Sequence, residues 1–164
     1  MTAEDDTTPA RSDPEADAVL ELVIAIGRAY RALEAGVRPY LAERGLGLSE
    51  FAVLEILLHK GPLPLGTIRD RILVSGASIT YVVSKLEQRG LVRRSPSPDD
   101  QRVVIAELTR TGRALIRGVF DGHVVHLRHL MAGLTRDEKR AASQLLRRLA
   151  RHAMDPTARV AGPT

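Results

Sequence analysis

Residues 65–108 read LGTIRDRILVSGASITYVVSKLEQRGLVRRSPSPDDQRVVIAEL, and their pattern indicates the fold class. Apolar residues at three- and four-residue steps predict a short helix over residues 65–72. The same spacing predicts a second helix over residues 77–89, which ends at Gly90. Because only a tight glycine-containing turn at residues 74–76 separates the two, the pattern indicates a helix-turn-helix.

The second half of the stretch changes character. In residues 91–108, two β-prone runs flank a polar tip that contains Pro96, Pro98 and two aspartates, which favours a hairpin with a longer loop. This is the only strand signal in the chain. A hairpin directly after a helix-turn-helix is typical of a winged helix, so we expect a mainly α fold: a winged helix-turn-helix domain with a two-stranded wing.

Helical periodicity continues on both sides of this domain. A long N-terminal helix, kinked or restarted at Pro39, and two C-terminal helices expose more apolar surface than a winged helix of about 60 residues can cover. Dimerisation through the chain ends would bury the excess, and a monomeric bundle is the alternative. The expected parts are a disordered tail (1–12), a dimerisation helix (13–45), the winged helix-turn-helix (46–109), C-terminal dimerisation helices (110–153) and a flexible tail (154–164).

Polar residues mark where the helices should begin. A side-chain oxygen at the residue before a helix accepts a hydrogen bond from a free backbone N–H of the first turn. The expected caps are Asp13, Ser49, Thr109 or Thr111, and Thr135, which forms a capping box with Glu138.

Charge and composition narrow the function. The net charge is +4, but residues 1–17 carry six acids and one arginine, so the rest of the chain is strongly basic and suits a polyanionic partner. The chain has no cysteine, which excludes disulfides, thiolate zinc sites and thiol-based sensing. No apolar run approaches the roughly 18 residues of a membrane span. With no secretory signal either, we expect a cytoplasmic protein.

The helix over residues 77–89 has a face suited to DNA. Its inward stripe is formed by Ile79, Val82, Val83 and Leu86, which leaves small, hydroxylic or cationic residues outside. Such side chains fit a major groove, where they reach base edges or phosphates, although an ordinary solvated face is the alternative. The outward residues are Ala77, Thr80, Tyr81, Ser84, Lys85 and Gln88, with Ser78 at the margin.

The hairpin carries a second set of candidate DNA contacts. Arg93, Arg94 and Arg102 flank its acidic tip. Asp100 stands two residues before Arg102, so a bent tip would let the carboxylate hold the guanidinium in one orientation. An arginine so placed suits the narrow, electronegative minor groove. An exposed ion pair without function is the alternative. Arg94, Asp100 and Arg102 are the wing residues that we expect to contact DNA.

These motifs together resemble the MarR family of winged-helix regulators over roughly residues 18–153. The resemblance rests on L-E-x-R-G-L-V from Leu86 to Val92, D-x-R at Asp100 and Arg102, and L-T-x-x-G from Leu108 to Gly112. It implies a triangular homodimer with each recognition helix in a major groove, each wing arginine in a minor groove, and a pseudo-palindromic operator. The segment over residues 51–87 resembles the subgroup of repressors that respond to catechols and hydroquinones.

The resemblance also implies where an effector would bind, namely between the dimerisation helices and the winged-helix lobe. A pocket there can couple ligand binding to the spacing of the lobes. A small aromatic effector would use an aromatic wall and one or two polar groups. The candidates are Tyr30, Tyr40, Phe51, His59, Phe120 and His123, although most are expected to be core residues.

Three alternatives stand beside this prediction, the first of them a regulator of the same fold. His123, His126 and His129 could suggest a metal-responsive regulator, but successive steps of three drift around a helix, so the three do not share one face. No catalytic motif is present, so we expect neither an enzyme nor a cofactor. A winged-helix module that binds protein instead of DNA is the third, and binding to DNA that weakens steeply with salt would distinguish it.

Overall fold

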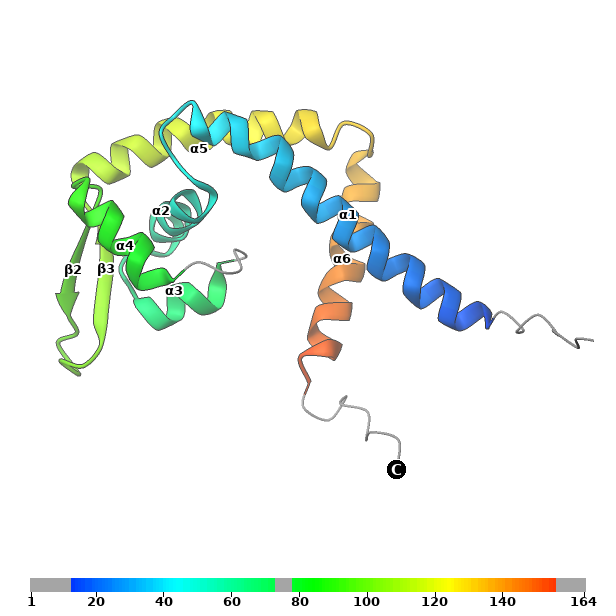
Figure 1. The fold of residues 1–164 in the computed structure, drawn as a ribbon, viewed down its shortest axis with the longest axis horizontal. Coiled ribbons are helices and arrows are strands. Elements are labelled where there is room, and N and C mark those ends of the chain that lie inside the picture. Colours follow the sequence, from blue (N-terminus) through cyan, green and yellow to red (C-terminus); the bar gives the residue numbers. More distant parts are fainter. Residues whose placement is uncertain (1–12, 73–77, 156–164) are drawn as a thin grey trace, which may run out of the picture.

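The computed structural model describes residues 13–72 and 78–155 (Figure 1). The predicted turn at residues 74–76, Ala77 and the tail at 1–12 lie outside this range, as does most of the tail at 154–164. In chain order the elements are α1 (Pro14–Ala42), α2 (Leu48–Lys60), β1 (Leu63–Pro64), α3 (Leu65–Arg71), α4 (Ile79–Gln88), β2 (Val92–Pro96), β3 (Val104–Leu108), α5 (Arg110–Leu130) and α6 (Arg136–Ala153). The mainly α winged-helix prediction is confirmed.

The sheet has one more strand than the sequence indicated. β2 and β3 form the predicted antiparallel hairpin, and β1 pairs with the other edge of β3, giving the order β1-β3-β2. In this pairing Leu63 lies opposite Ala106, and Pro64 lies opposite Ile105. A strand of two residues has no alternation to detect, so only its pairing partner identifies it.

Most of the expected caps are in place. Asp13 accepts from the backbone N–H of Glu15, Thr109 accepts from Gly112, and Thr135 forms the capping box with Glu138. The prediction for Ser49 is wrong, because α2 begins at Leu48, two residues before the start that a cap at Ser49 requires. Gly47 is the N-cap of α2, and its backbone N–H donates to the carboxylate of Glu50 over 2.7 Å. The start of the helix is therefore stabilised by a side chain of its first turn instead of by a hydroxyl at the N-cap. Pro39 lies within α1, which continues to Ala42.

The core of the winged-helix lobe lies where α2, α3, α4, α5 and the sheet meet. Its fully buried side chains include Leu54, Leu57, Ile68, Leu86 and Ile116. Two glycines of the family-like motifs have clear steric reasons. Gly90 ends α4 with φ +68°, a conformation that side chains disfavour. A Cβ on Gly112 would collide with the backbone carbonyl of Leu91, so the start of α5 needs glycine to pack against the start of the wing.

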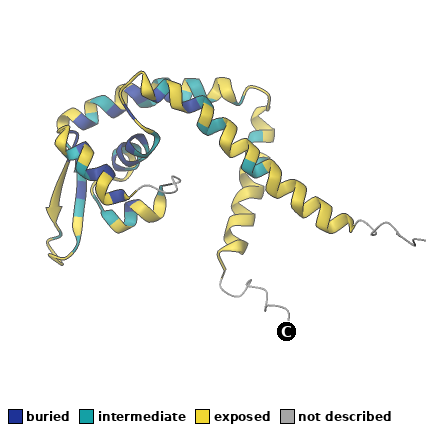
Figure 2. Ribbon diagram, in the orientation of Figure 1, coloured by how far each residue is buried: buried dark blue, intermediate teal, exposed yellow. Residues whose placement is uncertain are grey.

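The chain ends lack such a core. α5 lies beside the C-terminal half of α1 over the lobe, whereas α6 and the N-terminal half of α1 project away from it (Figure 1). Figure 2 shows that both projecting segments are almost entirely exposed, and α6 has no buried residue. Apolar side chains left exposed there include Val19, Leu20, Leu22, Val23, Leu145, Leu146 and Leu149.

Candidate nucleic-acid interface and effector pocket

Helix α4 presents the face predicted from the sequence. Ile79, Val82, Val83 and Leu86 are all buried. The opposite side carries Ser78, Thr80, Lys85 and Gln88, which are exposed, and Ser84, which is half-buried. Tyr81 is 70% exposed, far more than an aromatic ring that packs in a core. The helix therefore offers a polar surface with one prominent aromatic side chain.

Lys85 pairs with the carboxylate of Glu50 on the adjacent helix α2, a residue that was not among the predicted DNA contacts. Its Nζ lies 3.1 Å from Oε1 of Glu50, and Nη1 of Arg89 lies 3.2 Å from the same oxygen. Glu50 is only 6% exposed. Burial raises the pKa of Glu50, but the hydrogen bond from Gly47 and the charges of Lys85 and Arg89 outweigh it and hold the pKa below its usual value. The charged carboxylate thus links the start of α2 to α4.

Arg94 is likewise engaged within the lobe. Its Nε donates to Oε2 of Glu87 over 2.7 Å, and its Nη1 donates to Oγ of Ser84 over 3.1 Å. The hydrogen bond from Arg94 lowers the pKa of Glu87. Arg94 and Ser84 therefore brace strand β2 against α4, which holds the wing and the recognition helix in one relative position.

At the wing tip, the expected contact between Asp100 and Arg102 uses different atoms. Oδ1 of Asp100 accepts from the backbone N–H of Arg102 over 2.9 Å instead of holding its guanidinium. A two-residue spacing closes a local turn to the backbone N–H more readily than it brings a long side chain back. Within residues 13–72 and 78–155, the guanidinium of Arg102 has no ion pair, whereas Arg93 pairs with Glu107. Of the three wing arginines, Arg102 is thus the one that is exposed without an ion pair among the described residues.

A cavity of about 280 Å³ lies between α1, α2 and α5, where the projecting helices join the lobe. Three of the six predicted effector residues line it, namely Tyr30, Phe51 and His123. The rest of its wall is mostly apolar and consists of Leu33, Glu34, Val37, Leu48, Ala52 and Leu127.

His123 is the unusual group of this cavity. It is 7% exposed, its ring centroid lies 4.5 Å from that of Phe51, and its Nδ1 has no hydrogen-bond partner among the described residues. Burial, with the charge of His126, lowers the pKa of His123. The ring is therefore neutral near pH 7, and a buried polar atom on the cavity wall lacks a partner.

The other three predicted effector residues do not line this cavity. Tyr40 packs against α5, where its hydroxyl donates to the carbonyl of Val119 over 2.8 Å and its ring stacks on His126. His59 borders a different hollow, of about 310 Å³, between α2 and α3. Phe120 packs edge-on against His59 at 4.8 Å. The six predicted residues therefore do not form one site: three line the α1–α2–α5 cavity, and the other three lie outside it.

The histidines of α5 have separate environments. His123 faces the cavity, whereas Nε2 of His126 lies 2.9 Å from the carbonyl of Gly36. Among the residues that the structure describes, no three histidine or carboxylate side chains are grouped to hold a metal ion. None of the described helices is long and apolar enough to cross a membrane.

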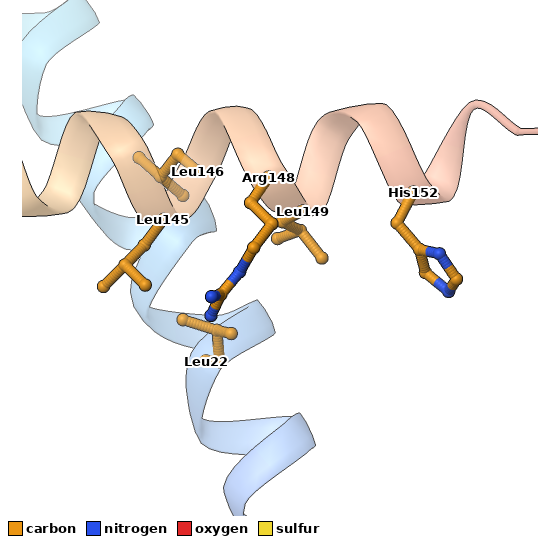
Figure 3. A pocket seen from close by; sticks show the side chains of 6 residues that line it. All are labelled: Leu22, Leu145, Leu146, Arg148, Leu149 and His152. Atoms are coloured by element: carbon orange, nitrogen blue, oxygen red, sulfur yellow. The ribbon is translucent and has the colours of Figure 1, made fainter.

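A second surface lies on the chain ends. Leu22 of α1 and Leu145, Leu146 and Leu149 of α6 line a hollow of about 530 Å³, together with Arg148 and His152 (Figure 3). The leucines of α6 that line it are 42–56% exposed. A hollow that is mostly leucine and this exposed is suited to covering by another apolar surface.

Comparison with known proteins identifies the group to which this arrangement belongs. The model of the MarR family matches residues 46–104, which is the winged-helix lobe up to the start of β3. A transcriptional regulator of Bacillus subtilis (strain 168), MhqR, is 40% identical over 134 residues, covering 82% of this chain and 92% of MhqR. The chain belongs to the MarR family. Its relatives are transcriptional regulators, which confirms the prediction that the chain is not an enzyme.

Solved MarR-like structures agree with this assignment. Bordetella bronchiseptica BpsR, described as regulated in its DNA binding by 6-hydroxynicotinic acid, is 26% identical with a TM-score of 0.71, covering 79% of this chain and 98% of BpsR. A mutant form of Escherichia coli MarR in complex with operator DNA is 22% identical with a TM-score of 0.72, covering 84% of this chain and 99% of that one. The second likeness concerns the fold alone.

Proposed function

We propose that this MarR-family regulator is a homodimeric repressor that binds a pseudo-palindromic operator and leaves it when a small phenolic or quinone-type aromatic compound enters the α1–α2–α5 cavity. The observation that carries the proposal is the pairing of an exposed polar face on α4 with an uncommitted arginine on the wing braced against it. The repressor would act in the cytoplasm, where its DNA lies.

The DNA contacts divide by how free each side chain is. Thr80, Tyr81 and Gln88 are exposed on α4 and suit base edges and phosphates in the major groove. Arg102 suits the minor groove, with Asp100 shaping the tip through its hydrogen bond to the backbone. Lys85 and Arg94 are shared between the protein's own carboxylates and DNA, so they serve mainly to orient the helix and wing. Ser78 and Ser84 complete the proposed surface.

The cavity favours an uncharged hydroxylated ring over an aromatic carboxylate. His123 is neutral, and its Nδ1 needs a hydrogen-bond partner, which a phenolic hydroxyl supplies. Glu34 is the acid of the wall and would repel a carboxylate, although Arg38 pairs with it at 2.8 Å. The resemblance of residues 51–87 to catechol- and hydroquinone-responsive repressors also supports an uncharged ring. The 6-hydroxynicotinic acid that regulates BpsR supports only a small hydroxylated ring, because it carries a carboxylate.

The test measures operator binding by fluorescence anisotropy, with DNA obtained by binding-site selection. Wild-type protein should bind with steep salt dependence and be released by catechol or hydroquinone but not by benzoate. His123→Leu should bind DNA normally and lose the response, whereas His129→Leu, an exposed neighbour on the same helix, should respond like the wild type. Absence of salt-dependent DNA binding would favour the protein-contact module. Release by benzoate alone would contradict the neutral-ligand site.

A further inference from the structure

Arg148 is a charged residue among the leucines of the apolar face of α6. It shares the hollow of Figure 3 with Leu22, Leu145 and Leu149, and its side chain extends toward Leu22. Among the described residues Arg148 forms no ion pair. When a second copy covers this face, as the proposed homodimer requires, the guanidinium loses much of its water. A charge that is desolvated without a partner strongly disfavours association.

Helical geometry narrows the carboxylates that can provide the partner. Glu15 stands seven residues before Leu22, which is close to two full turns, so the two lie on the same face of α1. Glu21 and Asp17 are turned from Leu22 by about 100° and 140° at 100° per residue. At the start of α6, Glu138 is engaged by Thr135, and Asp137 lies 3.7 Å from Arg140. Of the three acids near Leu22 on α1, Glu15 is therefore the one that shares its face.

Within one chain these two groups do not meet. Glu15 lies about 10 Å along α1 from Leu22, at 1.5 Å per residue, and α1 and α6 diverge from their crossing toward the N-terminus of α1 (Figure 1). Each protomer therefore presents a cation on α6 and an exposed acid on α1, both on faces that a dimer would cover. In a two-fold dimer, any contact between α6 of one subunit and α1 of the other is made twice.

We propose that Arg148 pairs with Glu15 of the partner subunit, and that this pair, made twice across the two-fold axis, determines which chains can dimerise. The inference rests on the homodimer of the proposed function. Leucines supply most of the buried surface but do not discriminate between similar apolar helices. A charge pair inside the interface does, because a related chain that lacks either member leaves a desolvated charge.

The test uses charge reversal and mixing, with dimerisation followed by sedimentation equilibrium and native mass spectrometry. Arg148→Glu alone and Glu15→Arg alone should each weaken the homodimer by about 10- to 100-fold in Kd, since each places like charges together. An equimolar mixture of the two variants should form a heterodimer within about threefold of the wild-type Kd, because both of its contacts again pair opposite charges. This recovery also shows that both variants fold.

The matched controls reverse charges on other faces of the same two helices. Arg147→Glu alters the outward basic face of α6, and Glu21→Arg alters α1 away from Leu22, so neither should change the dimer Kd by more than about twofold. If the wild type dimerises and the charge-reversed variants dimerise equally well, the charge pair is overturned but the homodimer is not. The same conclusion follows if the mixture of the two variants shows no recovery. A wild-type protein that is monomeric at micromolar concentration would overturn the homodimer instead.

Discussion

The winged-helix lobe and the projecting chain ends differ in how far they bury their leucines. In the lobe, Leu54, Leu57 and Leu86 are fully buried by elements of the same chain. On the chain ends, Leu145 and Leu146 are 56% and 45% exposed, although their helix has an equally regular pattern. Helical periodicity alone therefore does not tell which apolar face is covered within the chain and which needs a second copy.

The largest effect should come from removing a leucine on each side of this comparison. Leu54→Ala leaves a cavity in a closed core and should lower the free energy of unfolding by about 2–5 kcal/mol. Leu145→Ala should instead weaken the dimer, so its Tm should become more dependent on protein concentration than that of the wild type. Urea titrations and thermal scans at several concentrations measure both. Equal, concentration-independent losses would erase the distinction between the two regions.

A smaller effect is expected from Glu50→Gln, which removes the carboxylate joining α2 to α4. Glu50 is buried, but Lys85 is half-exposed, so the loss should be about 2 kcal/mol, between the values for surface and buried pairs. Because folding lowers the pKa of Glu50, its contribution is complete above the ordinary value of 4.5 and is lost as pH falls through the lower folded pKa. The variant should therefore lose less stability than the wild type between pH 5 and pH 3.

The control for this prediction is Glu34→Gln, which removes a more exposed carboxylate paired with Arg38. It should cost less than about 1 kcal/mol at neutral pH. Chemical denaturation monitored by circular dichroism at each pH gives the comparison. If both variants show the same pH dependence as the wild type, Glu50 does not stabilise the lobe as a charged group.

The smallest effect on stability, and a specific one on DNA, is expected from Arg102→Ala. Since its guanidinium has no ion pair within the described residues, the substitution should leave Tm unchanged while weakening operator binding by about tenfold or more. Arg94→Ala is the informative contrast, because it also breaks the contacts with Glu87 and Ser84 and should lower Tm slightly. Gel-shift titrations with unchanged affinity for Arg102→Ala would remove its role in the minor groove.

Local patterns predicted most of the lobe because their causes are local. The inward stripe of α4 follows from helical spacing, and the capping box of Thr135 and Glu138 follows from residues three apart. β1 escaped detection because two residues carry no period. The hydroxyl of Ser49 predicts a cap there, but the start of α2 depends on Glu50, whose carboxylate accepts from the backbone N–H of Gly47.

In the candidate DNA interface, too, local patterns predicted which side chains are exposed but not which ion pairs they form. The exposure of Tyr81 was foreseeable from its position on α4, whereas the engagement of Lys85 and Arg94 was not. Glu50 is 35 residues before Lys85, and no local rule brings them together. The nearest available signal was the i, i+4 spacing of Lys85 and Arg89, which places two cations on one helical edge.

The order of helices, the wing, the buried and exposed faces of α4 and the family all follow from local patterns, since each depends on the type and spacing of neighbouring residues. The tertiary structure decided which cations remain free, which three of six aromatic and histidine candidates share a cavity, and which apolar faces stay open. These are outcomes of distances between residues far apart in the chain. Such distances arise only when the whole core packs.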